Sequence, residues 1–558
     1  MNLRGMGMRK DSLQKKNIVF GTGNASEKIS KKIKNIEYYV DNDQAKWGKL
    51  FLGKKIYSPE KLLKEEKGSV FIVVASMYYL EIAKQLQELG FEDYINGLEY
   101  YNPNKKKISG YIETSNQIYS ILKGVDPVGR IFINKKTKQV YRGIFNDFSE
   151  VSLQVYKLCE EYGLFGRGLI ETKLTNLEVE PFDVVFEHRC IESFVYPFEW
   201  SPLMLKDAGV FVIELMLELD KAGLGLKDGH PFNVAFNNGS FKWYDFGSII
   251  LGKTLRSAIN EFISTFVNPL MLMSLGYYQK AITNMQMPLS YQDIYGYLNE
   301  EQRLVYEDFS TSVFDFYDNK PIDICLRKLK EWVQNIEISK EETRWSNYRI
   351  DTFDYLNDES QWNRKESEVI SFLKEVKPSK ILDLAGNAGW FCFAAEKYDI
   401  ESILTDNDYE CINFAYKRIV EEKKSNITPV VLDCITPSPG YYLGRPLEAE
   451  QGIIPFFASA KDRFKQELVL ALALVHHLVF FQYIGFEELI RQLKSFTTKY
   501  LVVEFIGPDD GYVSKWMNES FNWYNEDNFK KHLEEYFKII KITKSFPENR
   551  KLFFCELK

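Results

Sequence analysis

Three aspartates in the last third of the chain lie where expected strands end. The sequence predicts parallel strands at Lys380–Leu384, Ser402–Thr405 and Pro429–Leu432. Asp383, Asp406 and Asp433 lie at their carboxyl ends, which meet at one edge of a parallel sheet, where ligands bind. The second carboxylate can accept both hydroxyls of a ribose, and the third would lie near a base. Together they predict a site for an adenosyl ligand.

A turn of small residues follows the first of these strands, Ala385-Gly386-Asn387-Ala388-Gly389. Small side chains let the backbone approach a bound ligand closely. The residues that we expect to bind a cofactor here are Asp383, Ala385, Gly386, Asn387, Gly389, Asp406, Asn407, Asp433 and Cys434.

This region resembles a bacterial family of class I S-adenosylmethionine (SAM)-dependent methyltransferases of the nodulation type, whose first motif is D-L-G-x-N-x-G. The resemblance extends to Leu470–Leu478 and Val503-Glu504-Phe505. It implies a doubly wound seven-stranded sheet over residues 341–558, with SAM as cofactor. Ala385 replaces the usual first glycine, and we expect binding to survive because alanine is small. The remaining strands are expected at Leu468–Leu472, Leu501–Phe505, Ile539–Ile542 and Lys551–Cys555.

Two histidines are the best candidates for a catalytic base. His476 and His477 follow the fourth expected strand at the active-site end, and Glu504, which ends the fifth, is the second choice. Because adjacent residues are expected to point apart, one histidine should only pack. The stretch Arg344–Tyr348, with Trp362 and Lys365, also resembles the family. Lys365 would reach the cofactor carboxylate or an anionic substrate, unless it is a solvated helix lysine.

The middle of the chain carries spacings typical of protein kinases. Asp228 and Asn233 are five residues apart, as in a kinase catalytic loop, and Asp245-Phe246-Gly247 follows after a strand, a turn and a strand. These motifs predict a kinase-like α+β domain over residues 106–340. Asp228 would orient an acceptor hydroxyl, while Asn233 and Asp245 would hold Mg²⁺ for ATP.

The sequence does not decide whether this domain is an active kinase. A glycine-rich phosphate loop is not visible, and Arg142 stands where a nucleotide-pairing lysine is expected, with Glu150 as its expected helix partner. An active kinase and an inactive module that holds the substrate are both compatible with these residues.

The N-terminal residues 1–105 predict a Rossmann-like domain. Gly21-x-Gly23 and Asp41 each follow an expected strand, as in a dinucleotide fingerprint, although Ser26 takes the third small position. Val40–Asp43 and Lys46-Trp47-Gly48 resemble a small nucleotide-binding domain of bacterial surface-glycan enzymes, which implies a nucleotide or nucleotide-sugar ligand. A module that only packs or dimerises is the alternative. Lys105-Lys106-Lys107 is the expected linker.

Composition narrows the class of protein. The net charge of −7 argues against non-specific nucleic-acid binding, which needs a cationic surface. The seven cysteines include no CxxC pair and fit a reducing compartment. No apolar run is long enough for a transmembrane segment. We therefore expect a cytoplasmic protein.

These features lead to three hypotheses. The first is O-methylation of a sugar or sugar phosphate in surface polysaccharide biosynthesis, with a kinase-like domain that phosphorylates or holds the acceptor. The second keeps the methyltransferase, acting on another small molecule, beside an inactive scaffold. The third is a non-catalytic binding protein built from degenerate nucleotide folds.

Overall fold

The computed structural model describes residues 15–558, apart from positions 32, 77, 92–93, 98–118, 122–127, 135–136, 178, 180–181, 284, 286, 339–341, 347, 349, 443–444 and 447–457. The chain divides into two compact units. The first comprises Met1–Tyr119, Gly143–Ser149 and Thr175–Val185, and the second comprises Ser120–Arg142, Glu150–Leu174 and Phe186–Lys558. The expected linker at residues 105–107 lies outside the described residues.

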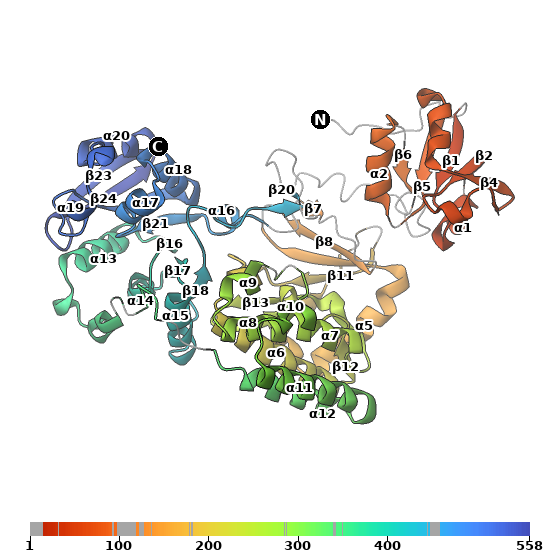
Figure 1. Ribbon diagram of the computed structural model, residues 1–558, viewed down its shortest axis with the longest axis horizontal. Helices are drawn as coiled ribbons and strands as arrows, with labels where there is room; N and C mark the ends of the chain where they lie inside the picture. Colours follow the sequence, from red (N-terminus) through yellow and green to blue (C-terminus); the bar gives the residue numbers. More distant parts are fainter. Residues whose placement is uncertain are drawn as a thin grey trace. The chain divides into compact units, whose positions relative to one another are not determined.

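A mostly parallel sheet forms the core of the first unit (red and orange in Figure 1). Its strand order is β3-β4-β2-β1-β5-β6, and β1 pairs in parallel with both β2 and β5. Strands buried on both faces are apolar throughout, as in the Val-Phe-Ile-Val-Val of β5. The elements are β1 (Lys16–Phe20), α1 (Asn24–Ser30), β2 (Ile36–Val40), β3 (Leu50–Phe51), β4 (Lys54–Tyr57), β5 (Val70–Val74), α2 (Tyr79–Glu88) and β6 (Tyr94–Asn96).

A five-stranded sheet of order β10-β11-β9-β8-β7 begins the central region. Its strands are β7 (Tyr119–Ile121), β8 (Gly129–Asn134), β9 (Val140–Phe145), β10 (Thr172–Leu174) and β11 (Phe182–His188), with α5 (Asn146–Glu161) after β9. The long helix α6 (Pro202–Lys221) follows, with proline in its first turn, where the missing N–H costs nothing.

Two short strand pairs follow α6 and position the motif residues. The first pair is β12 (Leu224–Leu226) with β15 (Ile249–Leu251), and the second is β13 (Val234–Asn237) with β14 (Ser240–Trp243). Asn238 and Gly239 join the second pair with positive φ angles of 50° and 73°. Two such residues form the type I′ turn that matches strand twist, as the Asn-Gly pair predicts.

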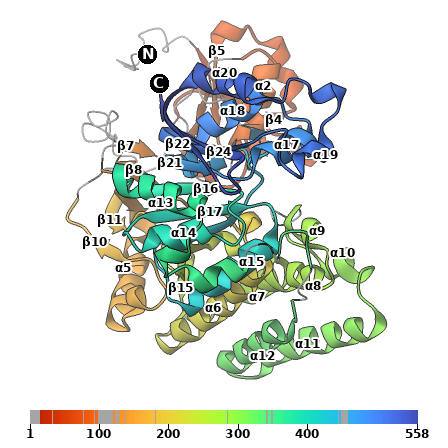
Figure 2. The same ribbon diagram turned by 90° about the vertical axis from the view of Figure 1, so that its left-hand side faces the viewer.

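The rest of the central region is helical (green in Figures 1 and 2). Helix α12 packs against both α6 and α11, which buries its apolar face. A π-helical turn at Ile263–Val267 interrupts the run between α7 and α8. The helices are α7 (Arg256–Phe262), α8 (Asn268–Ser274), α9 (Tyr278–Thr283), α10 (Tyr291–Tyr295), α11 (Glu300–Asn319) and α12 (Ile322–Asn335).

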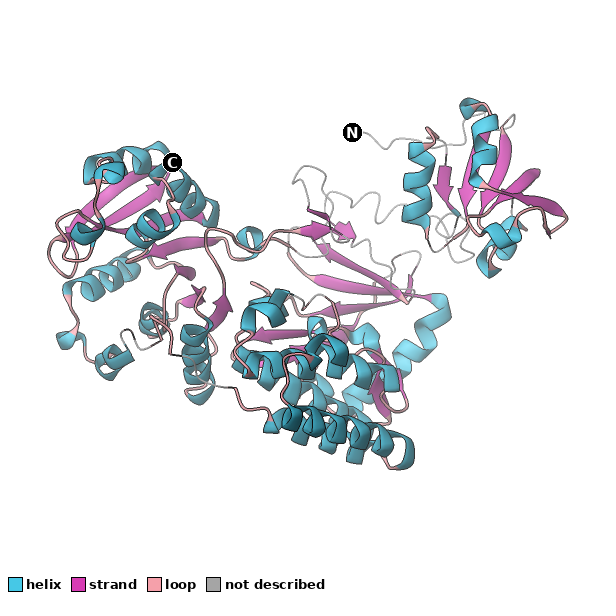
Figure 3. Cartoon of the chain, in the orientation of Figure 1, coloured by secondary structure: helices cyan, strands magenta, loops and turns pink. Residues whose placement is uncertain are grey.

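The C-terminal region is built on a seven-stranded sheet with helices around it (Figure 3). The order is β18-β17-β16-β21-β22-β24-β23, and only β24 is antiparallel to its neighbours. The strands are β16 (Lys380–Leu384), β17 (Glu401–Asp406), β18 (Ile427–Val431), β21 (Gln466–Ala471), β22 (Thr497–Ile506), β23 (Phe537–Lys544) and β24 (Arg550–Leu557). All seven expected strands are present. The order of the strands reverses between the parallel neighbours β16 and β21, and such a switch point is where sheets of this kind bind ligands.

The helices of this region are α13 (Arg364–Val376), α14 (Trp390–Glu396), α15 (Tyr409–Glu421), α16 (Ala460–Arg463), α17 (Val475–Gln482), α18 (Phe486–Phe496), α19 (Val513–Trp516) and α20 (Glu526–Tyr536), and a short hairpin joins β19 (Tyr441–Tyr442) to β20 (Arg445–Pro446). Within the described ranges, every helix is too short or too polar to traverse a lipid bilayer.

Candidate active site

A cavity of about 670 Å³ opens at the carboxyl ends of β16, β17, β18 and β21. Asp383, Asp406 and Asp433 all line it, so the three expected strand-end carboxylates meet at one edge of one sheet. A volume of this size accommodates a ligand as large as a nucleoside derivative. The turn residues Ala385–Ala388, with Asn407 and Cys434, also line the cavity.

The turn after β16 packs tightly against the strand ends. A Cβ atom at Gly386 would lie 2.6 Å from Asp383 Oδ2, so only glycine fits beside that carboxylate. Ala385 has φ +54°, in the left-handed region that glycine adopts freely and alanine adopts only at a cost. The replacement of the usual glycine is therefore accommodated by strain, at a cost of about 1–2 kcal/mol.

Asp406 joins the ends of two strands. Its Oδ2 accepts a hydrogen bond from the backbone N–H of Asn387 at 2.8 Å, and its Oδ1 accepts one from Asp408 N–H at 2.9 Å. Burial raises the pKa of this carboxyl to about 6, against the opposing effect of these backbone hydrogen bonds. Carboxylate oxygens can each accept more than one hydrogen bond, which leaves capacity for ligand hydroxyls.

Asp433 stabilises the loop in which it lies. Its Oδ1 accepts from the backbone N–H groups of Ile435 and Thr436, and its Oδ2 accepts from the Thr436 hydroxyl at 2.9 Å. The next residue, Cys434, is buried. Asp433 therefore shapes the wall of the cavity through its loop.

Lys365 lies on α13 and lines the cavity, but its ammonium is already paired. Its Nζ lies 2.7 Å from Glu504 Oε2, and both side chains are buried. Glu504 also accepts from Ala473 N–H at 2.9 Å and from the Ser545 hydroxyl at 2.5 Å. Burial alone would raise the pKa of Glu504, but the Lys365 charge and these hydrogen bonds lower it overall. This geometry does not favour Glu504 as a base, because its carboxylate is used to position Lys365. Lys365 itself is buried and is therefore not a solvated lysine.

Both histidines of the pair line the cavity, contrary to the expectation that one would point away. They lie in the first turn of α17, where neighbouring side chains diverge by about 100° and not by 180° as on a strand. Their rings are 4.0 Å apart. Burial, helped by nearby cations, lowers the pKa of His476 to about 2 and that of His477 to about 4, so both are neutral at pH 7. His476 Nδ1 has no hydrogen-bond partner among the described residues.

Aromatic rings surround the histidines. Trp516 stacks on His476 at 5.9 Å, and Trp345 meets His477 edge-on at 4.9 Å. At the mouth, the guanidinium of Arg344 lies over the rings of Trp345 and Phe481. Several lining residues belong to none of the motifs described above, among them Phe481, Tyr512, Trp516 and Arg550. Tyr512 and Trp516 follow the fifth strand, and this position was the feature of the sequence that could have identified them as lining residues.

The kinase-type residues of the central region lie in the expected elements, but Oδ1 of the Asp245 carboxylate is paired with an arginine. Arg142 on β9 is buried and lies 2.7 Å from Asp245 Oδ1 through its Nη2. The expected partner, Glu150, is exposed on α5, so that pairing was wrong. Asn233 is buried, and burial raises the pKa of Asp228. Among the described residues, no group of three or more His, Cys, Asp or Glu side chains could hold a metal ion.

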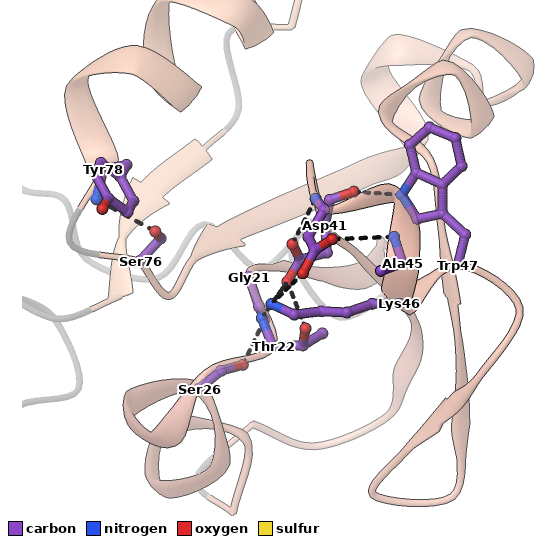
Figure 4. Close-up of polar contacts among 10 residues, drawn as sticks. Gly21, Thr22, Ser26, Asp41, Ala45, Lys46, Trp47, Ser76 and Tyr78 are labelled. Atoms are coloured by element: carbon purple, nitrogen blue, oxygen red, sulfur yellow. Dashed lines mark hydrogen bonds and ion pairs between the residues drawn. The ribbon is translucent and has the colours of Figure 1, made fainter.

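The fingerprint residues of the first unit also bond to one another (Figure 4). Asp41 Oδ2 accepts from the backbone N–H and the hydroxyl of Thr22 and from Lys46 Nζ at 3.1 Å. The carboxylate that would receive a ribose thus holds the loop between Gly21 and Gly23. These hydrogen bonds lower the pKa of Asp41, although burial opposes them.

The central and C-terminal regions meet through a buried ion pair in the second unit. Glu199 accepts two hydrogen bonds from the guanidinium of Arg463, at 2.6 and 2.9 Å, and a third from the Ser438 hydroxyl at 2.7 Å. Both charged side chains are at least nine-tenths buried. Tyr416 on α15 adds a hydrogen bond to Asp207 on α6 at 2.8 Å.

Comparison with known proteins gives a family match near the N-terminus and a relative that covers most of the chain. A family described as C2185-like, N-terminal, matches residues 13–95. The chain is 24% identical to nodulation protein NoeA of Rhizobium meliloti (strain 1021) over 453 residues, which cover 74% of this chain and 91% of NoeA. The expected likeness to nodulation-type proteins is thereby confirmed.

Solved methyltransferase structures are also similar to part of the chain. One is the N-methyltransferase NodS from Bradyrhizobium japonicum WM9, which is 12% identical over 38% of this chain and 98% of NodS, with a TM-score of 0.25. Another is magnesium protoporphyrin IX methyltransferase ChlM from Synechocystis PCC 6803 with bound SAM, which is 11% identical over 38% of this chain and 93% of ChlM, with a TM-score of 0.26. The bifunctional kinase-methyltransferase WbdD matches over 37% of this chain and 41% of its own, at 14% identity and a TM-score of 0.26.

Proposed function

We propose that this protein is a cytoplasmic SAM-dependent methyltransferase that methylates a hydroxyl of a sugar or sugar phosphate in surface polysaccharide biosynthesis. One observation carries the proposal: Asp383, Asp406 and Asp433 converge on one cavity at the switch point of a doubly wound sheet. The similarity to a nodulation protein over most of the chain supports it.

The residues of the cavity fit SAM. Gly386 lets the chain turn tightly against Asp383 and Leu404, and both Asp383 and this turn line the cavity where the amino acid end of the cofactor would bind. Asp406 has acceptor capacity for the ribose hydroxyls, and Asn407, Leu432 and Cys434 lie where the adenine would bind. When bound, SAM supplies a methyl group that is already activated on a sulfonium, so the protein has to align the acceptor and handle one proton.

The aromatic wall supports a glycoside acceptor. Phe481 and Tyr512 both line the cavity and are exposed by 50% and 65%, so their rings are accessible to a ligand. Flat rings suit the apolar face of a sugar, and Arg344 adds a cation that would attract a phosphate. His476 and His477 are neutral, so each can accept a hydrogen bond from an acceptor hydroxyl. His477, whose pKa is about 4, is the stronger base of the two, and we propose that it takes the proton.

We propose a holding role, not phosphoryl transfer, for the central region. Arg142 pairs with Oδ1 of Asp245, and its positive charge beside the carboxylate argues against Mg²⁺ at that residue. The buried Glu199–Arg463 pair instead supports a scaffold that holds the methyltransferase region in place. For the first unit, the internal bonding of Asp41 favours packing over a nucleotide or nucleotide-sugar ligand.

Transfer of labelled methyl tests the function. The protein is incubated with methyl-labelled SAM and with sugar phosphates and oligosaccharides, and the carbohydrate fraction is counted after alkaline treatment, which spares methyl ethers. We expect label in carbohydrate with the native protein and its loss in Asp406→Asn. Label in amines would contradict the proposed acceptor. Saturable SAM binding without transfer to any acceptor would favour the non-catalytic hypothesis.

A further inference from the structure

A second cavity, of about 480 Å³, lies in the helical part of the central region. The π-helical turn Ile263–Val267, the start of α10 and the middle of α11 form its walls. We propose that this cavity binds a neutral saccharide. The inference depends on these residues alone and not on the methyltransferase proposal.

The lining of this second cavity is rich in groups that bond to hydroxyls. The lining residues with amide or hydroxyl side chains are Asn260, Ser264, Asn268, Ser290, Tyr291, Gln292, Tyr306, Ser310 and Thr311. Glu307 is the one charged side chain among the described lining residues, and none is a lysine or arginine. Amides and hydroxyls both donate and accept, as sugar hydroxyls do, whereas an anion would need cations or donors only. The lining therefore suits an uncharged polyol.

Asn268 supplies an acceptor that the protein itself does not use. Its side chain is 1% exposed and lines the cavity, and its Nδ2 donates to Leu289 O at 2.5 Å. Its Oδ1 has no hydrogen-bond partner within the described part of the chain. A buried polar atom without a partner is costly, so it indicates a missing donor. Because this oxygen is itself buried, a ligand hydroxyl in the cavity would provide that donor once the Asn268 amide turns toward it.

The aromatic side of the cavity is fixed in place. Tyr291 stacks on Tyr306 with ring centroids 4.3 Å apart and planes 10° apart, and its hydroxyl donates to Glu307 Oε1 at 3.0 Å. Because stacking fixes one face of the Tyr291 ring and the hydrogen bond fixes its hydroxyl, the ring offers a rigid surface to the apolar face of a sugar. The adjacent π-helical turn is a rare conformation that is frequently found at functional sites.

Saturation-transfer NMR on the full-length protein tests the proposal. The probes are glucose, galactose, mannose and N-acetylglucosamine as neutral sugars, with glucuronic acid and glucose 1-phosphate as anionic ones. We expect transfer to at least one neutral sugar, reduced about fivefold in Tyr291→Ala through loss of the stacking surface. Gln292→Ala, at an exposed position, should also reduce it. Tyr277→Ala, an exposed tyrosine outside the cavity, is the matched control and should leave transfer unchanged.

Three results would overturn the inference. They are no transfer to any neutral sugar, transfer that Tyr291→Ala and Gln292→Ala leave intact, and transfer confined to the anionic sugars. Asp406→Asn, which should weaken SAM binding at least tenfold, should leave this signal unchanged. A sugar signal that survives in Tyr291→Ala would belong to the methyltransferase cavity, not to this one.

Discussion

The Asp406 carboxylate accepts a hydrogen bond from the backbone N–H of Asn387 at 2.8 Å, so the end of β17 holds the turn that follows β16. This bond connects the two parts of the cavity that would contact different ends of SAM. A change at Asp406 should therefore affect both the ribose contact and the shape of the turn.

The buried pair of Lys365 and Glu504 gives a stability prediction. Glu504→Gln leaves the Lys365 ammonium buried without its counter-charge, so the free energy of unfolding should fall by about 3 kcal/mol or more. Lys365→Met combined with Glu504→Gln should lose less than the sum of the single changes. Denaturant unfolding measures all three. Glu368→Gln, which breaks the more exposed pair with Lys541, is the control and should cost less than about 1 kcal/mol.

Ala385 predicts a stabilising substitution. Its positive φ disfavours alanine, so Ala385→Gly should raise the free energy of unfolding by up to about 1 kcal/mol and preserve SAM binding. Ala388→Gly, in the same turn but without a positive φ, should lower it. A melting temperature that falls equally in both variants would show that strain at Ala385 is not relieved.

The pKa of Asp406 predicts how SAM affinity depends on pH. Burial favours the protonated acid, so the carboxylate, which is mostly ionised at pH 7, becomes mostly protonated as the pH falls through about 6. The acid is a poorer acceptor for two hydroxyls, and Kd should rise by about tenfold between pH 7 and pH 5. Calorimetry across this range measures it. Asp406→Asn, which cannot titrate, should bind weakly with a much flatter profile; an equally steep profile in the variant would assign the effect to another group.

The Arg142–Asp245 pair predicts no magnesium-dependent ATP binding. With the guanidinium 2.7 Å from the carboxylate, ATP and Mg²⁺ together should leave the melting temperature unchanged. SAM at one hundred times its Kd should instead stabilise the protein by about 2.7 kcal/mol. An ATP-induced rise that requires Mg²⁺ and disappears in Asp245→Asn would restore the kinase hypothesis.

The sequence predicted the strands and the strand-end aspartates well, because runs of apolar residues and the aspartates that follow them can be recognised within short segments. Contacts between side chains that lie far apart in the sequence were harder to predict. Arg142 and Asp245 are 103 residues apart, and nothing near Arg142 distinguishes Asp245 from Glu150 as its partner. Asp41 has the position of a ribose acceptor, but only the folded loop brings Thr22 and Lys46 onto it. Likewise, Trp516 reaches His476 only once β21 and β22 pair.

Isothermal titration of SAM into the native protein, Asp406→Asn and Asp399→Asn is the most direct measurement of the central claim. Asp399 is an exposed aspartate in the turn before β17 and provides the same chemical change outside the cavity. We predict saturable binding to the native protein and to Asp399→Asn, with at least a tenfold weaker Kd in Asp406→Asn through the loss of charged hydrogen bonds to the ribose. The absence of saturable heat with the native protein, or equal affinities in all three proteins, would contradict the account.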